Sequence, residues 1–600
     1  MTLANLLWIS AFLLPTLAVA GLGITHVADL GGWALRLRDT ITKYAAATLI
    51  PGGILAVQGP AAGTAELPWL LLGTNVAVDD IARPLLLVAV LLYAAALIAT
   101  YSSRTERAHV LSSFLLVSFV GNALVFVAAD AVTFYLGFAA MSLAAYGLVI
   151  HERTGTAIRA GRVYIVLTLV GEMATLAALL MIVSAGGLML ADAPAAVAES
   201  GHAEPIVLLL LIGFGVKAGT VPLHVWLPLA HPAAPPPASA VLSGTMIKAG
   251  LVGWLRFLPL GEIAMPVWGT VLVIVALVGA FAALIPGVMQ DNAKVALAYS
   301  SISQMGFLTV LVGAALAEPV LAPACVLAAV VYAVHHGMAK GGLFLGVTVW
   351  RTHGDGWIRY WVIGGLCLLA LAVAGAPFGS GAVAKYAAKE AIAPAGFLGV
   401  ELADLLPLVG TISTLLLLRA GWLLLSGPRD HAWGVDGAIV SWSILIIGGT
   451  VLTWLLAFQW SPLLSVPGLA PAPMWDAAWP ILTGLLLAGA GVLLSRSERT
   501  SSIVRSFWSH TVPAGDLLIP EERMAHRTGV ALQRGANALS DQRAASLSKA
   551  QAALHRTARG ARRVERLEHR LAGWVGSGAV TLVCAGALAL GTLIAVVILT

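Results

Sequence analysis

Seven basic side chains lie inside stretches of the chain that are otherwise almost entirely apolar. They are Lys217, Lys248, His335, His336, Lys340, Lys385 and Lys389. An ammonium group within a bilayer span costs at least about 2.5 kcal/mol, so a buried lysine needs a partner, a water-filled cavity or a function. Snorkelling to a nearby surface explains any single lysine but not all of them together. Buried lysines, like histidines, can exchange protons near neutral pH, so a row of them joined by water predicts a proton path.

Two of these lysines stand beside residues that interrupt a helix. One interruption is "VKAGTVP", and the other is "GAPFGSGAVAK". Broken helices expose backbone carbonyls at mid-membrane, where transporters bind their ions. The predicted breaks are at Gly219, Pro222, Gly375, Pro377 and Gly379.

The composition places these residues in an all-α polytopic membrane protein. Of 600 residues, 59% are hydrophobic and 10% are charged, with a mean hydropathy of +0.92. No water-soluble globular composition approaches these values. We count about sixteen apolar runs long enough to cross a bilayer, including a weak one near 41–57. The sequence leaves no cytosolic domain that could bind a nucleotide or a nucleic acid.

The sequence predicts no cofactor and no metal site. Cys325, Cys367 and Cys584 lie in apolar segments without CxxC or Cys/His spacing, so we interpret them as small buried hydrophobic residues. The chain shows no redox or hydrolytic site of its own, so any enzyme activity would belong to a larger complex.

Loop charges predict the orientation. Loops after odd-numbered spans are basic, as in "SSRTERAH" (102–109), and loops after even-numbered spans are poor in Lys and Arg. The odd side is therefore cytoplasmic and the amino terminus faces out, in a bacterial cytoplasmic (inner) membrane. The amino terminus lacks a positive n-region, so we expect it to remain as the first span. Arg256 and Arg419 are exceptions to the charge pattern, each placed where it can snorkel or face the interior.

The two helix breaks fall in the fourth span of consecutive groups of five spans. Because five is odd, the two groups have opposite orientation, which is typical of inverted-repeat transporters. The predicted organisation is N-terminal helices in 1–108, a first five-helix repeat in 109–260, a second in 261–426, peripheral helices in 427–496, a cytoplasmic-side amphipathic helix in 497–572 and a membrane anchor in 573–600.

The 496–570 arm carries a narrow apolar stripe on a polar helix of about 40 residues, or 60 Å. The stripe is formed by Leu532, Leu539, Leu547 and Leu554. One interpretation is a solvated arm drawn to anionic lipid headgroups. The other is a brace that lies along the membrane and contacts neighbouring subunits, which the anchor beyond the helix favours.

Several motifs resemble those of one family. The stretches "PLHVWLPLAHPAAPPPASAVLSGTMIKAG", "DNAKVALAYSSISQMGF", "HHGMAKGGLFLG" and "GAPFGSGAVAK" are similar, in this order, to the antiporter-like subunits of respiratory complex I, membrane-bound hydrogenases and multisubunit cation/proton antiporters. The resemblance covers about residues 75–425, and the long helix with the last span resembles the lateral helix and final span of the largest such subunit.

The resemblance implies roles for individual residues. Lys217 matches the central channel lysine, Lys248 the connecting lysine and Lys385 the exit residue, while His336 and Lys340 match a pair in the family's broken eleventh span.

The chain also departs from the family pattern. The family has a glutamate nine residues after the aspartate that Asp130 matches, whereas this chain has Ala139, and Leu229 replaces the carboxylate of the usual "WLPDAH". Glu172, on the next span, is the nearest candidate for a relocated carboxylate. We count Glu172 and Asp130 with the seven basic residues as candidates for the proton path.

Three functions follow as hypotheses. The first is a proton-translocating subunit of a larger energy-converting complex, with other membrane subunits, lipid and protons as partners; whether Na⁺ is moved as well is open. The second is a membrane subunit of an ion-gradient-driven uptake system, for example for inorganic carbon. The third is a structural anchor that has lost transport, for which the missing glutamate is the main argument.

Overall fold

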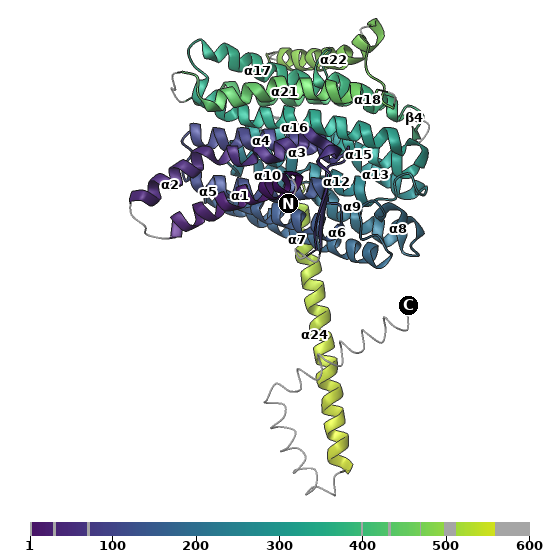
Figure 1. Cartoon of the computed structure of the whole chain (residues 1–600). Helices are drawn as coiled ribbons and strands as arrows, with labels where there is room; N and C mark the ends of the chain where they lie inside the picture. Colours follow the sequence, from purple (N-terminus) through teal and green to yellow (C-terminus); the bar gives the residue numbers. More distant parts are fainter. Residues whose placement is uncertain are drawn as a thin grey trace. The chain divides into compact units, whose positions relative to one another are not determined.

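The computed structural model describes residues 3–27, 32–68, 73–397, 400–429, 434–461, 463–468, 470–496 and 512–557. It is almost entirely helical, which confirms the all-α polytopic fold (Figure 1). Thirteen of the described helical segments are long and apolar enough to cross a membrane, and Ile358–Ala374 is a shorter apolar helix. The predicted final anchor lies outside the described residues, and the count of sixteen and the two repeats stay predictions.

The N-terminal part contains four α-helices and one hairpin. Its elements are α1 (Leu3–Val27), α2 (Gly32–Tyr44), η1 (Ala45–Leu49), α3 (Ile50–Gln58), η2 (Gly59–Ala62), β1 (Thr64–Leu67), β2 (Thr74–Ala77) and α4 (Ala82–Ser102). The weak span predicted near 41–57 is part of a helical segment over Gly32–Ala62. Strands β1 and β2 pair antiparallel with Thr64 opposite Ala77, a short element in a loop that apolar patterning does not predict.

The next helices carry Lys217 and Lys248. They are α5 (Ala108–Val127), α6 (Ala131–Val149), α7 (Gly155–Ser184), α8 (Ala193–Glu199), α9 (Ala203–Ala218), α10 (Trp226–Ala233), α11 (Pro236–Val241), the π-helical turn η3 (Leu242–Met246) and α12 (Lys248–Phe257). Helices α5 and α6 approach closely because Gly121 and Gly137 face each other's backbone, where a Cβ would collide.

The elements that carry the remaining basic residues follow. They are α13 (Pro266–Ala282), α14 (Leu284–Val288), α15 (Ala293–Ala317), η4 (Pro319–Leu321), α16 (Ala322–His353), α17 (Ile358–Ala374), α18 (Ser380–Ala391), β3 (Gly396–Phe397), β4 (Val400–Glu401), α19 (Leu402–Leu405), α20 (Leu408–Leu425), α21 (Gly437–Gln459) and α22 (Pro471–Arg496). Helix α16 contacts α4, α11, α15, α17, α18 and α21, so it lies at the centre of the packing (Figure 1).

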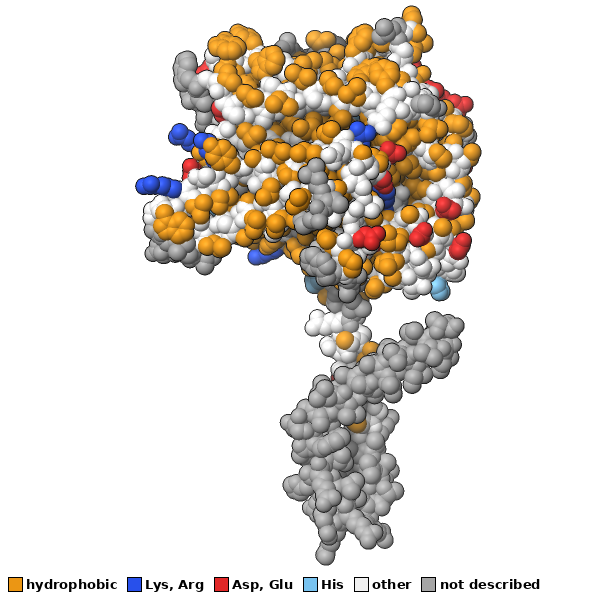
Figure 2. Space-filling view, in the orientation of Figure 1, with side chains coloured by type: hydrophobic (Ala, Val, Ile, Leu, Met, Phe, Trp, Pro, Cys, Tyr) orange, Lys and Arg blue, Asp and Glu red, His pale blue; other side chains and the backbone are white. Residues whose placement is uncertain are grey.

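Burial differs among the helices in the way that a membrane protein requires. The most apolar windows of Pro236–Phe257 and Ala293–Ala317 are entirely buried, whereas only 17% of the corresponding window of α22 is buried. The visible face of residues 1–517 is mostly hydrophobic, with charged side chains confined to small groups (Figure 2). Such a surface suits contact with lipid or with other membrane subunits.

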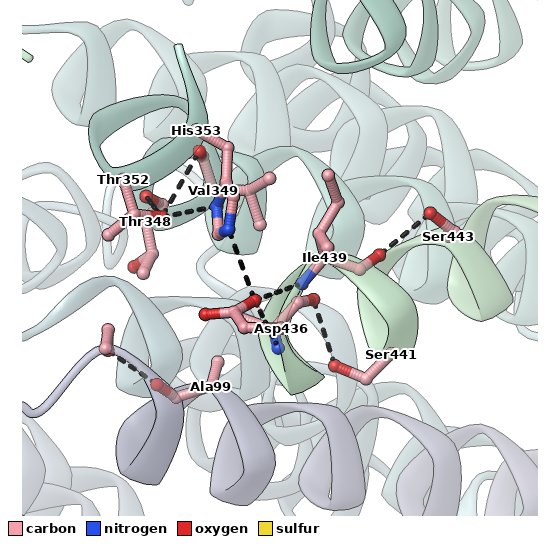
Figure 3. A network of polar contacts seen from close by, with 11 residues as sticks. Ala99, Thr348, Val349, Thr352, His353, Asp436, Ile439, Ser441 and Ser443 are labelled. Carbon is pink, nitrogen blue, oxygen red and sulfur yellow. Dashed lines mark hydrogen bonds and ion pairs between the residues drawn. The ribbon is translucent and has the colours of Figure 1, made fainter. Parts of the chain in front are cut away.

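The C-terminal end of α16 is fixed to the start of α21. Asp436 caps α21 by accepting hydrogen bonds from the N–H groups of Ala438 and Ile439, and its Oδ1 lies 3.4 Å from His353 Nε2 (Figure 3). The other ring nitrogen of His353 lies 2.7 Å from the Thr352 hydroxyl. This network anchors the helix that carries three of the candidate proton carriers.

The chain divides into a compact unit through Leu517 and a second unit from Leu518 onward. In the second unit the structure describes one 40-residue helix, α24 (Leu518–Thr557). Leu539 and Leu547, from the predicted stripe, are exposed on it.

Candidate functional site

Lys217 lies in the last turn of α9, directly before a helix break. Gly219 closes the helix with φ +71°, a conformation that favours glycine, and the chain resumes as α10 at Trp226. The Trp226 indole donates a 2.8 Å hydrogen bond to the carbonyl of Val216, so one carbonyl at the end of α9 is satisfied. The break therefore places a 5% exposed lysine at the end of a half-helix.

Aromatic groups surround the Lys217 ammonium. Its Nζ lies 3.5 Å from the Tyr164 hydroxyl and 5.4 Å from the centroid of the Phe138 ring. Tyr164 in turn donates a 2.9 Å hydrogen bond to the carbonyl of Ser142. Ring faces attract a cation without neutralising it, so Lys217 keeps the freedom to gain or lose a proton.

Glu172 and Lys217 line one small cavity. The cavity lies between α6, α7, α9 and α10 and has a volume of about 10 Å³, which is about one water molecule. The two groups are not within the 4.0 Å of a direct ion pair, and neither carboxylate oxygen of Glu172 has a hydrogen-bond partner among the described residues. Among these residues, Glu172 is also the only buried carboxylate within a helix long and apolar enough to span the membrane. A water-mediated Glu172–Lys217 pair stays a prediction that this geometry allows.

Lys248 begins α12, immediately after the π-turn η3. Its Nζ donates a 2.7 Å hydrogen bond to the carbonyl of Ser243 inside the turn, and the Ser243 hydroxyl lies 2.9 Å from that of Ser301 on α15. Gly250 packs against the end of α9, where a Cβ would lie 2.7 Å from the Ala218 nitrogen. The tight packing brings the start of α12 beside the helix end that carries Lys217.

Helix α16 presents His335, His336 and Lys340 to the interior, all with 0% exposure. Lys340 Nζ donates a 3.1 Å hydrogen bond to the carbonyl of Leu297 on α15, and His335 Nδ1 lies 2.8 Å from the Ser380 hydroxyl on α18. The resemblance implies a broken helix here, but α16 runs without interruption from Ala322 to His353. The uninterrupted helix has no proline near the two histidines, and Gly337 and Gly341 instead serve close packing against Gly244 and Leu92.

Lys385 lies on α18, after the second break. Helix α17 ends at Ala374, Gly375 follows with φ +100°, and Lys385 Nζ donates a 2.8 Å hydrogen bond to the carbonyl of Ala374. One turn further on, Lys389 forms a 2.6 Å ion pair with Asp476 of α22. Lys385, Lys389 and Asp476 line a cavity of about 50 Å³, enough for several water molecules.

The structure adds polar groups that the sequence did not single out. Tyr332 donates a 2.6 Å hydrogen bond to Gln304, and Gln304 donates one of 2.8 Å to the Ser413 hydroxyl. His231 stacks on Phe344 with ring centroids 4.2 Å apart. The signal that could have found these groups is their polarity inside apolar helices, which is less conspicuous for hydroxyl and amide groups than for lysine.

Several buried polar atoms lack a hydrogen-bond partner among the described residues. They are both ring nitrogens of His231 and of His336, Nε2 of His335 and both carboxylate oxygens of Glu172. Buried polar groups in native proteins are almost always paired, with protein or with ordered water. These atoms are therefore free to bind water, and they lie on helices α7, α10 and α16.

Asp130 has a different role from the other candidates. It caps α6 by accepting hydrogen bonds of 2.7 Å from the backbone N–H and the hydroxyl of Thr133, and it accepts a 2.8 Å bond from the N–H of Asn75. These contacts fix a loop next to β2, so the structure does not bring Asp130 into the row of lysines and histidines.

The two arginines that broke the loop-charge pattern are both held. Arg256 makes a two-pronged ion pair with Asp79, one arm of which measures 2.7 Å. Arg419 donates two hydrogen bonds, of 2.9 and 2.6 Å, to the carbonyl of Gln290. Both side chains therefore serve the packing of helix ends.

Parts of the chain are similar to known proteins. Residues 128–360 match the family described as "NADH:quinone oxidoreductase/Mrp antiporter, TM". The chain is 37% identical over 229 residues to hydrogenase-4 component B of Escherichia coli (strain K12), covering 36% of this chain and 34% of that protein. It is 34% identical over 295 residues to NAD(P)H-quinone oxidoreductase chain 4 3 of Trichormus variabilis, covering 48% of this chain and 53% of that protein. The matches thus span about a third to a half of the length of these relatives.

Two solved structures share the fold. The Mrp complex from Dietzia sp. DQ12-45-1b matches 94% of this chain and 63% of its own chain with a TM-score of 0.65 at 21% identity. The membrane-bound sulfane sulfur reductase, an archaeal respiratory membrane complex, matches 89% of this chain and 95% of its own with a TM-score of 0.64 at 22% identity.

Proposed function

We propose that the protein is a proton-translocating subunit of a larger energy-converting membrane complex, because residues 128–360 match the family described as "NADH:quinone oxidoreductase/Mrp antiporter, TM". The observation that carries the proposal is the shared cavity of Glu172 and Lys217, which puts the only buried carboxylate of the described spanning helices beside the lysine at the α9 break. A carboxylate near a buried lysine favours its protonated form, and separating the two favours proton release.

The proposed path runs from Lys217 through Lys248, Lys340 and the two histidines to Lys385. A proton taken up at Lys217 leaves its ammonium for a water molecule and binds the neutral amine of the next lysine, which passes a proton on in turn. Over a full cycle each lysine gains one proton and loses one. The Nζ of Lys217 donates a hydrogen bond to a hydroxyl, and the Nζ atoms of the other three lysines donate hydrogen bonds to backbone carbonyls. Each lysine is held by such hydrogen bonds, which can break and form again as it loses and gains a proton. The cavity at Lys385, Lys389 and Asp476 is the proposed exit.

We also propose partners, a membrane location and an orientation for the subunit. Relatives named as parts of hydrogenase and quinone oxidoreductase complexes support partners that are other membrane subunits. We propose a bacterial inner membrane with the amino terminus outside and α24 on the cytoplasmic side, since the basic loops support this orientation. The two inverted five-helix repeats, 109–260 and 261–426, are the proposed frame, and Na⁺ is a proposed second ion.

Substitution of Lys217 tests the function. Lys217→Ala removes a buried charge, so we expect normal insertion and complete loss of proton translocation, measured by dye quenching in membrane vesicles that contain the intact complex. Lys217→Arg is expected to fail as well, because a guanidinium does not release its proton. Lys43→Ala, at an exposed position on α2, is the control. Wild-type translocation by Lys217→Ala would remove Lys217 from the path and favour a structural anchor.

A further inference from the structure

The segment 512–517, which directly precedes α24 in sequence, packs against the break between α9 and α10. The carbonyl of Val512 accepts a 3.1 Å hydrogen bond from the side chain of Gln290, and Gly515 lies against the Leu229 side chain. The N–H of Asp516 lies 3.4 Å from the Tyr299 hydroxyl on α15. Gln290 belongs to the loop 290–294, which our span count places on the same side as the basic loop 102–109, so we infer that the segment lies on that side.

His224 lies in the turn between α9 and α10 and faces this segment. Its Nε2 lies 3.2 Å from Asp516 Oδ1, and its side chain is 3% exposed, whereas that of Asp516 is 23% exposed. The other ring nitrogen, Nδ1, is buried and has no hydrogen-bond partner among the described residues. One imidazole thus faces a water-accessible carboxylate with one nitrogen and the protein interior with the other.

We propose that Asp516 and His224 form a proton-uptake relay that delivers protons from the side of the basic loops to the break at Lys217, an inference that rests on the proposed function. In the Nδ1–H tautomer of His224, a proton that water delivers to the Asp516 carboxylate passes to the lone pair of Nε2. The carboxylate is then ionised again and accepts the hydrogen bond from Nε2–H. The proton on Nδ1 then leaves for an inner water molecule, and ring rotation restores the first tautomer. The ring gains one proton and loses one, so its charge is unchanged over a cycle.

The local electrostatics suit this role. Burial acts to raise the pKa of Asp516, but the hydrogen bonds from His224 and from the N–H of Leu517 lower it by more, so this pKa lies below its usual range. The carboxylate is therefore ionised at neutral pH, and a partly exposed negative charge attracts protons to the mouth of the path.

A purely structural clamp does not need the carboxylate. The contacts of Val512 with Gln290 and of Gly515 with Leu229 already hold the segment, and both are independent of the Asp516 side chain. What the carboxylate adds is a proton acceptor between water and a buried imidazole.

The test uses the intact complex in vesicles. Asp516→Asn keeps the shape and a hydrogen bond to His224 but cannot carry a proton, so we expect at least a tenfold slower translocation. Millimolar imidazole or formate should restore much of the rate, because a small buffer can deliver the proton instead. His224→Gln should give a similar loss, and the double variant should be no slower than either single variant. Asp541→Asn, at an exposed position of α24, is the matched control.

The outcomes separate the relay from other roles. A wild-type rate for Asp516→Asn overturns the relay, as does a loss that neither buffer relieves, which indicates a structural clamp only. If Lys217→Ala abolishes translocation while Asp516→Asn leaves it intact, the proposed function stands and only the relay fails. If Lys217→Ala itself translocates normally, the proposed function fails first.

Discussion

The Nζ of Lys248 donates its 2.7 Å hydrogen bond to the carbonyl of Ser243, five residues earlier in the same span. In a regular α-helix that carbonyl would accept from the backbone N–H four residues later. Here the π-turn shifts the pattern, and the N–H of Ile247 instead reaches the carbonyl of Leu242 over 3.4 Å. The turn therefore frees a carbonyl at the point where the connecting lysine needs a ligand, as π-bulges at functional sites often do.

Gly244 is expected to be essential for this turn. A Cβ at Gly244 would lie 2.5 Å from Leu92 Cδ1 and 3.0 Å from the Gly337 carbonyl, so Gly244→Ala must displace α16 or α4. We expect a loss of about 1–3 kcal/mol in the free energy of unfolding. Thermal unfolding in detergent measures it, with Gly364→Ala as the control, because a Cβ at Gly364 meets nothing within 4 Å. Equal stability of the two variants would contradict the tight approach.

Glu172→Gln tests whether the carboxylate on α7 replaces the family's glutamate, at whose position this chain has Ala139. The amide keeps the size of the side chain but carries no charge, so Lys217 loses its switchable partner. We expect translocation to fall by at least about tenfold, in the range of lost acid–base groups, with normal assembly. Dye quenching in vesicles measures the rate, and Glu199→Gln, at an exposed position on α8, is the control. Normal translocation by Glu172→Gln would exclude the pairing.

The ion pair between Asp79 and Arg256 predicts a pH dependence of stability. Burial acts to raise the pKa of Asp79, but the hydrogen bond and charge of Arg256 lower it more, so this pKa lies below its usual value of 3.8. A carboxyl group whose pKa is lower in the folded than in the unfolded state adds to the free energy of unfolding. The whole contribution is present above the unfolded-state pKa, near pH 4, and it is lost as the pH falls through the folded-state pKa.

We therefore expect Asp79→Asn to lower the free energy of unfolding by about 1 kcal/mol at pH 7, since the pair is partly exposed. The difference from wild type should shrink below pH 4, where the wild-type carboxyl also becomes neutral. Unfolding curves of both proteins from pH 3 to pH 7 check this, and a difference that is independent of pH would argue against the charge of Asp79 as its cause.

The sequence predicted the residues that carry charge better than it predicted their partners. Lys217 and Lys385 stand out because an ammonium in an apolar run is costly, and Gly219 and Gly375 stand out because glycine and proline end helices. Hydropathy contains no information on which carbonyl or hydroxyl a lysine will meet, because such contacts join segments far apart in the chain. The contact of Asp516 with His224, 292 residues away, is of this kind.

The sequence pattern also does not predict a helix irregularity when apolar residues continue through it. The π-turn at Leu242–Met246 contains no proline, and its span reads as one regular helix. The uninterrupted α16 is the opposite case, in which two adjacent histidines and several glycines accompany a continuous helix. In both cases, packing against neighbouring helices decides whether the helix is regular. Such packing leaves no periodic pattern of apolar residues in a single sequence.

Two truncations separate the role of α24 from that of the segment before it. Cutting after Leu517 removes α24 and everything beyond but keeps the contacts of Val512, Gly515 and Asp516 with the helical unit. If the 496–570 arm is a brace, this variant should insert and keep its unfolding temperature, while neighbouring subunits are lost or reduced on purification. Cutting after Arg496 should lose those subunits too, and it should also lower the unfolding temperature, because the clamp on the α9–α10 break is gone. Full subunit stoichiometry after the cut at Leu517 would exclude the brace, and an arm that only binds lipid would then show a salt-dependent loss of membrane affinity instead.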